Sequence, residues 1–225
     1  MLHEAKMAPN ALLYNMSNSD TYKGTPMNIV VYCGSSTPTN PHFRECACKL
    51  GTWIAANGHT LVYGGSSVGL MGMVSRAALD RDGTVYGVEP QFFIEAGVAQ
   101  HELSKLYVTD DMTQRKATMI ELGDVFVALP GGVGTLEEIS EIFSRIRLGL
   151  EPNECFLLNV DGFYDPLRNL LNAMLNQGFL SQEDMNRIHF PETIEEFARM
   201  FEYSQSHPTK PRTTAPELRS PAARD

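Results

Sequence analysis

Short apolar runs alternate with helically spaced apolar positions along most of the chain. Runs rich in β-branched and aromatic residues predict strands at 28–33, 60–63, 84–88, 106–109, 125–129 and 154–159. Apolar residues at spacings of three and four predict helices at about 40–57, 70–81, 111–122, from 136 onward, and at 165–177, 181–188 and 193–201, whereas 92–100 shows a weak pattern. Strands that are almost wholly apolar and alternate with helices are typical of a parallel sheet covered on both faces. We therefore predict an α/β fold, a Rossmann-like doubly wound parallel sheet of about six or seven strands with helices on both faces.

The 225 residues are enough for one domain with a sizeable core. Residues 1–26 are polar without clear periodicity and are expected to form a flexible arm, and residues 27–203 to form the folded domain. Pro, Thr, Arg and Ala dominate the end of the chain, so residues 204–225 are expected to be a disordered tail.

The composition of the chain argues against several classes of function. The net charge of -9 argues against nucleic-acid binding through a basic face. There is no apolar run long enough for a membrane span and no secretory signal pattern, so we expect a cytoplasmic protein without membrane partners. The four cysteines are scattered over predicted strands and helices, which indicates free thiols, and neither they nor the six histidines have metal-ligand spacing.

Three predicted strands end in Gly- and Ser-rich turns, at 34–36, 64–72 and 131–134. Parallel sheets bind ligands at the carboxyl ends of their strands, so these turns would line one crevice if the strands are neighbours. None of them is a GxGxxG dinucleotide fingerprint or a GxxxxGK[ST] P-loop. NAD binding and ATP hydrolysis are therefore not predicted.

The last of these turns lies in the most informative stretch, residues 124–147, which reads as strand, glycine loop and helix. Backbone N–H groups at a helix N-terminus, together with the helix dipole, favour an anion, and a phosphate is the expected ligand. The same loop places two carboxylates, Glu137 and Glu138, in the first helical turn.

Four motifs in order, VYCGSS (31–36), YGGSSVGLMG (63–72), MTQRKATM (112–119) and LPGGVGTLEE (129–138), resemble the LONELY GUY family over about residues 27–203. The resemblance implies a cytokinin riboside 5′-monophosphate phosphoribohydrolase domain, which cleaves the N-glycosidic bond of an N6-substituted AMP to free base and ribose 5-phosphate. It also implies a nucleoside 5′-monophosphate substrate, a homodimer with the active site near the subunit interface, and no metal or organic cofactor.

The resemblance assigns Arg115 and Glu138 as the catalytic pair. A carboxylate beneath the sugar would stabilise an oxocarbenium-like state or orient the attacking water, and an arginine would pair with anionic oxygens of the substrate. The phosphate would lie on the loop amides, with the Thr135 hydroxyl as an added donor. The substrate-binding residues it implies are Gly34, Ser35, Gly65, Ser66, Gly69, Met71, Gly72, Lys116, Gly131, Gly132, Val133, Gly134, Thr135 and Glu137.

Structural interpretations compete with these roles. Thr135 and Glu138 have the spacing of a capping box, with Thr135 at the N-cap. Arg115 and Lys116 fit a solvated helix face, and the glycines of 64–72 fit a tight strand-to-helix turn as well as a phosphate contact. Asp111 or Thr113 would cap the helix at 111–122.

Three departures from the family pattern concern substrate choice. Ser66 replaces the third glycine of the family's glycine run, and Thr113 stands where a histidine is frequent. Arg145 and Arg147 replace a tryptophan and a glutamine, and their added charge is expected to reshape the base pocket.

Three other functions would use parts of the same pattern. A general AMP or nucleotide phosphoribohydrolase would use the same residues. A molybdenum-cofactor carrier would bind an anion on a glycine-rich loop without turnover, but it does not need the acidic pair and Arg115. A pyridoxal-dependent decarboxylase needs a Schiff-base lysine, for which Lys116 is the only motif residue, and no partner for the pyridine nitrogen is evident, so a lysine decarboxylase is not predicted.

Overall fold

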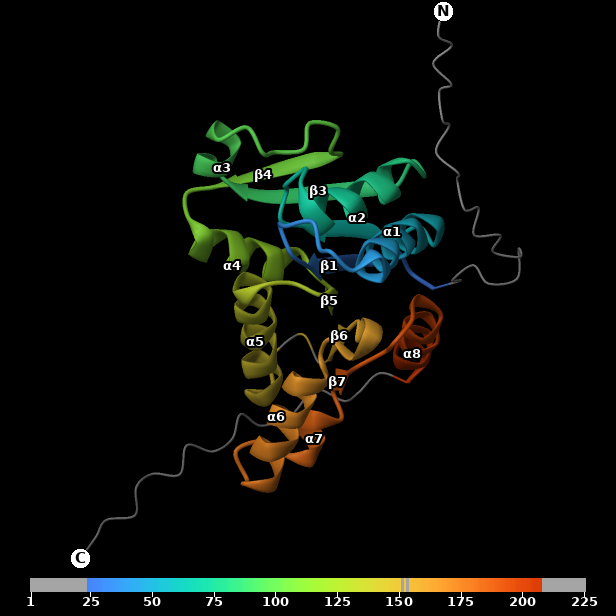
Figure 1. The fold of residues 1–225 in the computed structure, drawn as a ribbon, viewed down its shortest axis with the longest axis vertical. Coiled ribbons are helices and arrows are strands. Elements are labelled where there is room, and N and C mark those ends of the chain that lie inside the picture. Colours follow the sequence, from blue (N-terminus) through green and yellow to red (C-terminus); the bar gives the residue numbers. More distant parts are fainter. Residues whose placement is uncertain (1–23, 151, 153, 208–225) are drawn as a thin grey trace, which may run out of the picture.

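Seven parallel strands form one sheet between two layers of helices in the computed structural model, which describes residues 24–150, 152 and 154–207 (Figure 1). The strands are β1 Asn28–Tyr32, β2 Thr60–Tyr63, β3 Thr84–Pro90, β4 Lys105–Thr109, β5 Val125–Ala128, β6 Cys155–Leu157 and β7 Ile188–His189. The helices are α1 Pro41–Ala56, α2 Gly69–Leu79, α3 Gln91–Glu95, α4 Met112–Leu122, α5 Val133–Arg147, α6 Asp165–Asn176, α7 Gln182–Met185 and α8 Ile194–Ser206, with a 3-10 turn η1 at Val160–Gly162. The predicted fold class is confirmed.

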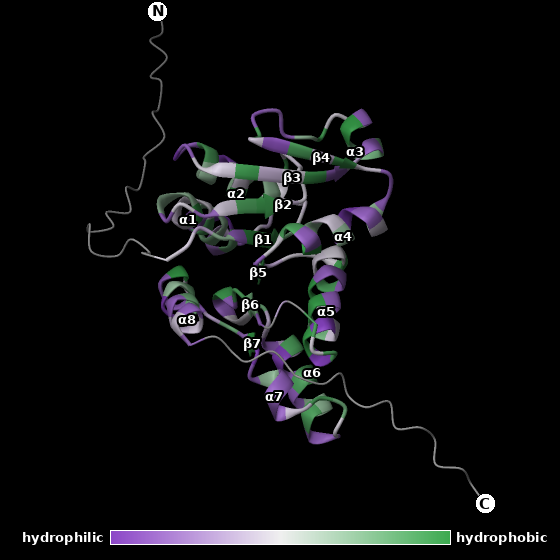
Figure 2. Ribbon diagram, turned by 180° about the vertical axis from the view of Figure 1, so that it is seen from behind, coloured by the Kyte–Doolittle hydropathy of each residue, from purple (hydrophilic) through white to green (hydrophobic). Residues whose placement is uncertain are grey.

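Successive residues of the central strand face opposite layers, which explains why its apolar run is continuous. Ile29 and Val31 pack in a core with α1, α2 and α8, whereas Val30 and Tyr32 pack in a second core with α4, α5 and α6. All four side chains are buried. The helices show both hydrophobic and hydrophilic bands in Figure 2, as expected for helices that cover a sheet on one side only.

The order of the strands, β4-β3-β2-β1-β5-β6-β7, places the functional turns together. The chain moves outward from β1 to β4 and then returns to β5 on the other side of β1, so that Val31 of β1 lies between Tyr63 of β2 and Val127 of β5. The turns after β1, β2 and β5 therefore meet at the point where the direction of winding reverses, which is where open α/β sheets bind ligands. The predicted condition that these three strands are neighbours is confirmed.

The fold differs from the prediction in three places. Residues 181–188 were predicted as one helix, but the helix covers only Gln182–Met185, and Ile188–His189 form the edge strand β7 beside β6. The Gln91–Glu95 segment, where the pattern is weak, is the short helix α3. Helix α8 continues to Ser206, beyond the predicted domain end at 203. The predicted arm up to residue 23 and the tail from 208 lie outside the described residues.

The crossing of α1 and α2 depends on one small residue. A Cβ atom added at Gly51 would lie 2.2 Å from the Val74 carbonyl oxygen and 3.1 Å from the Ala77 Cβ atom. Gly51→Ala is expected to lower the free energy of unfolding, because overpacking costs about 1–3 kcal/mol whereas alanine gains at most about 1 kcal/mol of helix propensity. Urea unfolding monitored by circular dichroism measures the change.

Gly134→Ala provides the control for this prediction. A Cβ atom at Gly134 in α5 would meet no heavy atom within 4 Å, so this variant should unfold at the same or a higher urea concentration than the parent protein. Equal stability of the Gly51 and Gly134 variants would show that the α1–α2 crossing relaxes at no cost.

Candidate active site

A cavity of about 560 Å³ lies at the carboxyl ends of β1, β2, β3 and β5. The three glycine turns contribute to it as the sequence predicted, and α4 and α5 close it from one side. Its lining residues are Cys33, Gly34, Ser35, Gly64, Ser66, Val68, Met71, Glu89, Phe93, Val98, Met112, Arg115, Gly132, Val133, Gly134, Thr135, Glu137 and Glu138. The predicted residues that the structure keeps out of this lining are Gly65, Gly69, Gly72, Lys116 and Gly131.

The loop after β5 leads into an uncapped helix N-terminus. Helix α5 begins at Val133 with Gly132 at the N-cap, and no side chain accepts a hydrogen bond from its first turn. A Cβ atom at Gly132 or Gly134 would meet nothing within 4 Å, so the space above the loop is open. Free N–H groups at the positive end of a 15-residue helix favour an anion such as a phosphate.

The capping-box interpretation of Thr135 and Glu138 is wrong. Because α5 begins three residues before the predicted start at 136, Thr135 lies inside the first turn and not at the N-cap. Thr135 instead packs beneath Gly131, where an added Cβ atom would lie 2.2 Å from its Oγ1 atom. The Glu138 side chain therefore has no capping role, and it faces the cavity.

Buried hydrogen bonds hold the loop in position. The Tyr164 hydroxyl donates to the Leu129 carbonyl oxygen at 2.7 Å, at the point where β5 passes into the loop. The Gly34 N–H group donates to the Pro130 carbonyl oxygen at 3.4 Å and so joins the turn after β1 to the same loop. The geometry of this loop is thus set by groups on both sides of the switch point.

The turn between β2 and α2 has a structural reason for its glycines. Gly69 has a φ of +62°, and a Cβ atom there would lie 2.3 Å from the Ser35 carbonyl carbon. The N–H group of Leu70 donates to the Gly34 carbonyl oxygen at 3.1 Å, so this helix N-terminus is partly satisfied within the protein. These contacts favour the tight-turn interpretation of the glycines. The residues of this turn that line the cavity are Gly64, Ser66, Val68 and Met71.

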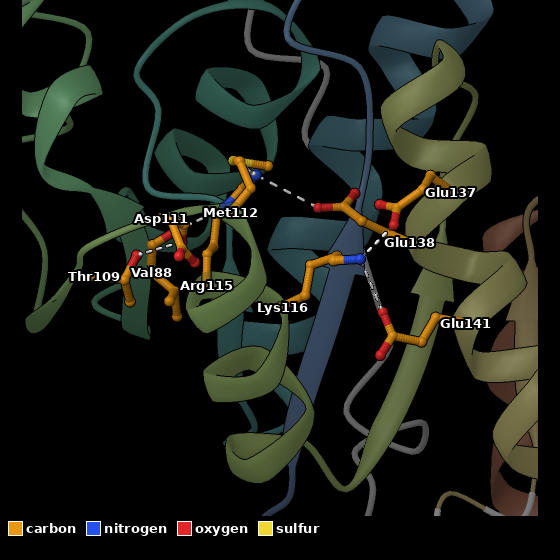
Figure 3. A network of polar contacts seen from close by, with 9 residues as sticks. All are labelled: Val88, Thr109, Asp111, Met112, Arg115, Lys116, Glu137, Glu138 and Glu141. Atoms are coloured by element: carbon orange, nitrogen blue, oxygen red, sulfur yellow. Dashed lines mark hydrogen bonds and ion pairs between the residues drawn. The ribbon is translucent and has the colours of Figure 1, made fainter.

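Arg115 is a buried residue of α4 that is anchored on three sides. Its Nε atom donates to the Val88 carbonyl oxygen at 3.1 Å, and its guanidinium lies against Gly64, where an added Cβ atom would be 2.0 Å from Nη2. Its Nη1 atom lies 3.5 Å from Glu138 Oε1 across the cavity (Figure 3). The side chain is therefore not on a solvated helix face. Asp111 caps the same helix by accepting a hydrogen bond from the Gln114 N–H group, which settles the choice between Asp111 and Thr113.

Glu138 combines burial with a nearby cation. Burial raises the pKa of its carboxyl to about 7, an effect that Glu137 adds to and that Arg115 and Lys116 oppose. The predicted catalytic pair, Arg115 and Glu138, is thus brought together in the described structure with a carboxyl that titrates near neutral pH. Such a perturbed carboxyl in a cleft is typical of a functional site.

Glu89 is a cavity residue that the sequence reasoning missed. It lies at the end of β3, is 1% exposed and has a pKa raised to about 7 by burial, partly offset by the Arg115 charge. Its Oε2 atom is a buried oxygen without a hydrogen-bond partner among the described residues. A signal was present, because an acidic residue follows the apolar run of this strand at the sheet edge where ligands bind.

Lys116 points out of the cavity toward α5. It forms ion pairs with Glu137 and, at 3.2 Å, with Glu141 (Figure 3). The hydrogen bond that the Lys116 ammonium donates to Glu137 is the main reason that the pKa of Lys116 is raised above its usual value. A Schiff-base lysine needs a lowered pKa and access to the substrate, so the geometry opposes a pyridoxal-dependent decarboxylase.

The charged departures from the family pattern lie elsewhere. Arg145 and Arg147 do not line the cavity formed by the described residues, and Arg147 lies 3.5 Å from Asp184 of α7. The expectation that they reshape the base pocket is therefore not supported. Thr113 is exposed and outside the lining, whereas Ser66 is part of it.

The described residues do not support thiol or metal chemistry in this cavity. Cys33 lines the cavity, but it is buried and burial raises its pKa well above the usual value, which keeps it a thiol. The described chain contains no group of three or more His, Cys, Asp or Glu side chains placed to hold a metal ion. Among its helices there is none with the length and apolar character needed to cross a membrane.

The buried Glu89 carboxyl gives a stability prediction with a definite sign. The unfolded carboxyl loses its proton near its ordinary value of 4.5 and the folded one near 7, so the folded state binds more protons in between, and stability falls as pH rises through this window. At pH 8 the penalty is on the order of 3 kcal/mol. Glu89→Gln should therefore raise the free energy of unfolding by about 1–3 kcal/mol at pH 8.

Chemical denaturation at pH 8 and pH 5 measures this effect. At pH 5 the folded carboxyl is already neutral, so the gain from the substitution should be less than half of that at pH 8. Glu95→Gln, the same change on the exposed side of α3, should have no effect at either pH. If the gain in free energy of unfolding were equal at both pH values, its cause would be packing and not ionisation.

Comparisons with known proteins agree with the fold and the motifs. The family model described as "Possible lysine decarboxylase" matches residues 71–201. A cytokinin riboside 5′-monophosphate phosphoribohydrolase of Rhodococcoides fascians is 42% identical over 172 residues, covering 76% of this chain and 87% of that protein. The cytokinin riboside 5′-monophosphate phosphoribohydrolase LOG4 of Arabidopsis thaliana is 36% identical, covering 85% of this chain and 90% of that protein.

A search of solved structures adds support for the architecture. A molybdenum-cofactor carrier protein of Chlamydomonas reinhardtii superposes with a TM-score of 0.63 at 20% identity, over 81% of this chain and 99% of that chain, which shows a shared fold alone. This structural likeness does not identify the family of the chain. The family is identified by the sequence relatives, the matching family model and the four ordered motifs. By these criteria the chain belongs to the LONELY GUY family, whose family model keeps the older description of possible lysine decarboxylases.

Proposed function

We propose that this protein hydrolyses the N-glycosidic bond of N6-substituted adenosine 5′-monophosphates, releasing the free cytokinin base and ribose 5-phosphate. The observation that carries the proposal is the buried Arg115–Glu138 pair, 3.5 Å apart, beside an uncapped helix N-terminus in one cavity. The names of the relatives in Rhodococcoides fascians and Arabidopsis thaliana support the same activity.

The geometry suggests a role for each group. The amides of Gly132 to Thr135 bind the phosphate, and Arg115 pairs with anionic oxygens of the substrate. As the bond to the base breaks, its electron pair leaves with the base and positive charge develops on the sugar. The ionised Glu138 stabilises that charge or orients the attacking water, whose hydroxyl joins the sugar carbon while its remaining proton balances the departing base.

The test is a product assay on purified protein with AMP and isopentenyladenosine monophosphate, in which free base is separated by chromatography. Faster release of isopentenyladenine than of adenine is the expected result. Similar rates would identify a general nucleotide phosphoribohydrolase. Release from neither nucleotide, together with a molybdopterin that co-purifies, would replace the proposal with a carrier function.

A homodimer is part of the proposal. Val133 on the first turn of α5 is 85% exposed beside the cavity, and Leu136, one turn along the helix, is also exposed. Apolar side chains at the rim of a site are consistent with cover by a second copy. Light scattering coupled to size exclusion should give twice the monomer mass, and Val133→Glu should shift it toward the monomer.

A further inference from the structure

The cavity has two ends that follow the order of the strands. The uncapped N-terminus of α5 follows β5, the turns of Gly34 and Gly64 follow β1 and β2, and Glu89 ends β3. Neighbouring strands lie about 4.8 Å apart, and β3 is three strands away from β5. Glu89 at the end of β3 is therefore about 14 Å across the sheet edge from the end of β5, which leads into the glycine loop before α5. If the phosphate lies at α5, as the proposed function requires, the base extends toward β3.

Arg115 divides these two ends. It is anchored to β3 through the Val88 carbonyl oxygen and lies 3.5 Å from Glu138 of α5. The reacting bond belongs beside this pair, because Glu138 must approach the sugar. The part of the cavity beyond Arg115, toward α3, is then left for the base and its substituent, and Phe93 and Val98 are its apolar wall.

Glu89 is a charged group in that apolar end, and its Oε2 atom is buried without a hydrogen-bond partner among the described residues. Its side chain is almost wholly buried. A buried polar oxygen without a partner destabilises the folded state, so this atom calls for a partner that the described part of the chain does not supply.

The surroundings of Glu89 hold it in a defined position. Gly65, with a φ of +82°, packs directly on it: an added Cβ atom there would lie 2.8 Å from the Glu89 Cβ atom and 3.0 Å from Oε2. The adjoining wall is fixed to the same turn, since the Ser67 N–H group donates to the Val98 carbonyl oxygen at 2.8 Å. Gly65 therefore serves this site indirectly, by leaving room for the carboxyl.

We propose that Glu89 is a specificity-determining residue that accepts a hydrogen bond from a donor at the base end of the nucleotide. Two chemical sources supply such a donor, the exocyclic N–H of adenine and a hydroxyl on the N6 substituent. A carboxyl oxygen accepts in both of its protonation states, so the assignment holds on either side of neutral pH. The inference rests on the proposed function for the direction in which the nucleotide lies.

Two matched pairs of nucleotides separate the two sources. AMP and inosine monophosphate differ in the exocyclic amine, which inosine monophosphate replaces with an acceptor oxygen, and in N1, which carries a hydrogen in inosine monophosphate alone. Isopentenyladenosine monophosphate and its derivative with a terminal hydroxyl on the same chain differ in that hydroxyl alone. The ratio of kcat/KM within each pair is measured by chromatography of the released base for the parent protein and for Glu89→Met, which keeps an unbranched chain without an acceptor oxygen.

The parent protein is expected to favour the donor-bearing member of at least one pair by about tenfold or more, and Glu89→Met should reduce that ratio to within about threefold. Collapse of the first ratio identifies the exocyclic N–H as the donor, and collapse of the second identifies the hydroxyl. No preference in the parent protein, or ratios unchanged in Glu89→Met, would overturn the proposal. Glu95→Gln, on the exposed side of neighbouring α3, is the matched control and should leave both ratios as they are.

A second variant keeps the test decisive if Glu89→Met does not fold. Glu89→Gln adds an amide donor that pairs with the inosine oxygen, so the preference for AMP should fall about tenfold when the exocyclic N–H is the donor. When the hydroxyl is the donor, the retained amide oxygen should keep the preference for the hydroxylated nucleotide within about threefold of the parent value.

The failure of this inference is distinguishable from failure of the proposed function. If base is released but the kcat/KM ratios within the two pairs do not change when Glu89 is replaced by Met, the inference alone is overturned. Absence of released base from all four nucleotides would overturn the proposed function, and calorimetric dissociation constants for the same four nucleotides would then give the ratios that decide whether Glu89 reads the donor.

Discussion

Glu138→Gln is expected to lower kcat for base release by at least about a hundredfold, the loss typical when a preorganised charge-stabilising group is removed, while the dissociation constant for nucleotide changes little. The substitution keeps the shape of a buried side chain and removes the negative charge that faces the developing positive charge of the sugar. Single-turnover kinetics and calorimetric binding measure the two quantities separately. Full activity would remove Glu138 from the reaction.

Glu137→Gln is the matched control for this variant. The two carboxylates are adjacent in sequence, but Glu137 is exposed and its main contact is the ion pair with Lys116. We expect its loss to change kcat by less than about tenfold, because an exposed ion pair contributes little to the local free energy. Equal losses in the two variants would mean that the combined negative charge of the two carboxylates matters more than the position of either one.

The pH profile gives an independent test of Glu138. Its pKa is raised to about 7, and the proposed role needs the ionised form, so the rate should fall as pH decreases below about 7. In Glu138→Gln this acidic limb should disappear from the residual activity. A limb that persists in the variant would assign the titration to another group, with Glu89 as the first candidate.

Arg115→Met is expected to cause the second large effect, on stability as well as on activity. Arg115 is the cation that lines the described cavity, which also carries the carboxyls of Glu89, Glu137 and Glu138. Removing one partner of a buried ion pair typically costs about 3–5 kcal/mol, and the loss of the contact proposed between Arg115 and the substrate should lower kcat/KM by about a thousandfold or more.

The dependence of this loss on pH identifies its cause. Arg115 lowers the pKa values of Glu89 and Glu138, so in the variant at pH 8 these carboxyls must either stay ionised without its charge or take up a proton. At pH 5.5 they are already neutral, so the destabilisation measured by urea unfolding should be smaller at the lower pH. The double variant Arg115→Met, Glu138→Gln should recover part of the stability at pH 8. A loss that is the same at both pH values would point to the packing of Arg115 on Gly64.

The sheet could be predicted from the sequence because its central strands are buried on both faces. Each residue from Ile29 to Tyr32 is apolar, and such runs have few alternatives to a parallel strand. The edge strand β7 could not be predicted, because its two residues, Ile188 and His189, are held by pairing with β6 and not by a pattern of their own. Helix α3 has five residues, too few for a period to emerge.

The site was predictable in its chemistry and less so in its geometry. The motifs placed Arg115 and Glu138 in one site, and the structure brings their side chains together. The start of α5 was misplaced because Thr135 and Glu138 have the spacing of a capping box. In the structure the helix begins at Val133 with Gly132 at the N-cap, and Thr135 packs against Gly131, so the box is not formed. Glu89 was missed because a single acidic residue after a strand has no motif around it.

The open space above Gly132 and Gly134 has a consequence for how sequence variation in this protein should be read. A library at these two positions selected only for folded protein would retain many side chains, since a Cβ atom there meets nothing within 4 Å. A parallel selection for enzymatic turnover would return glycine, because any side chain occupies the volume reserved for the ligand. At Gly69, where the backbone itself demands glycine, the two selections would agree. The difference between the two selections, mapped along the chain, would outline the bound molecule without a structure of the complex.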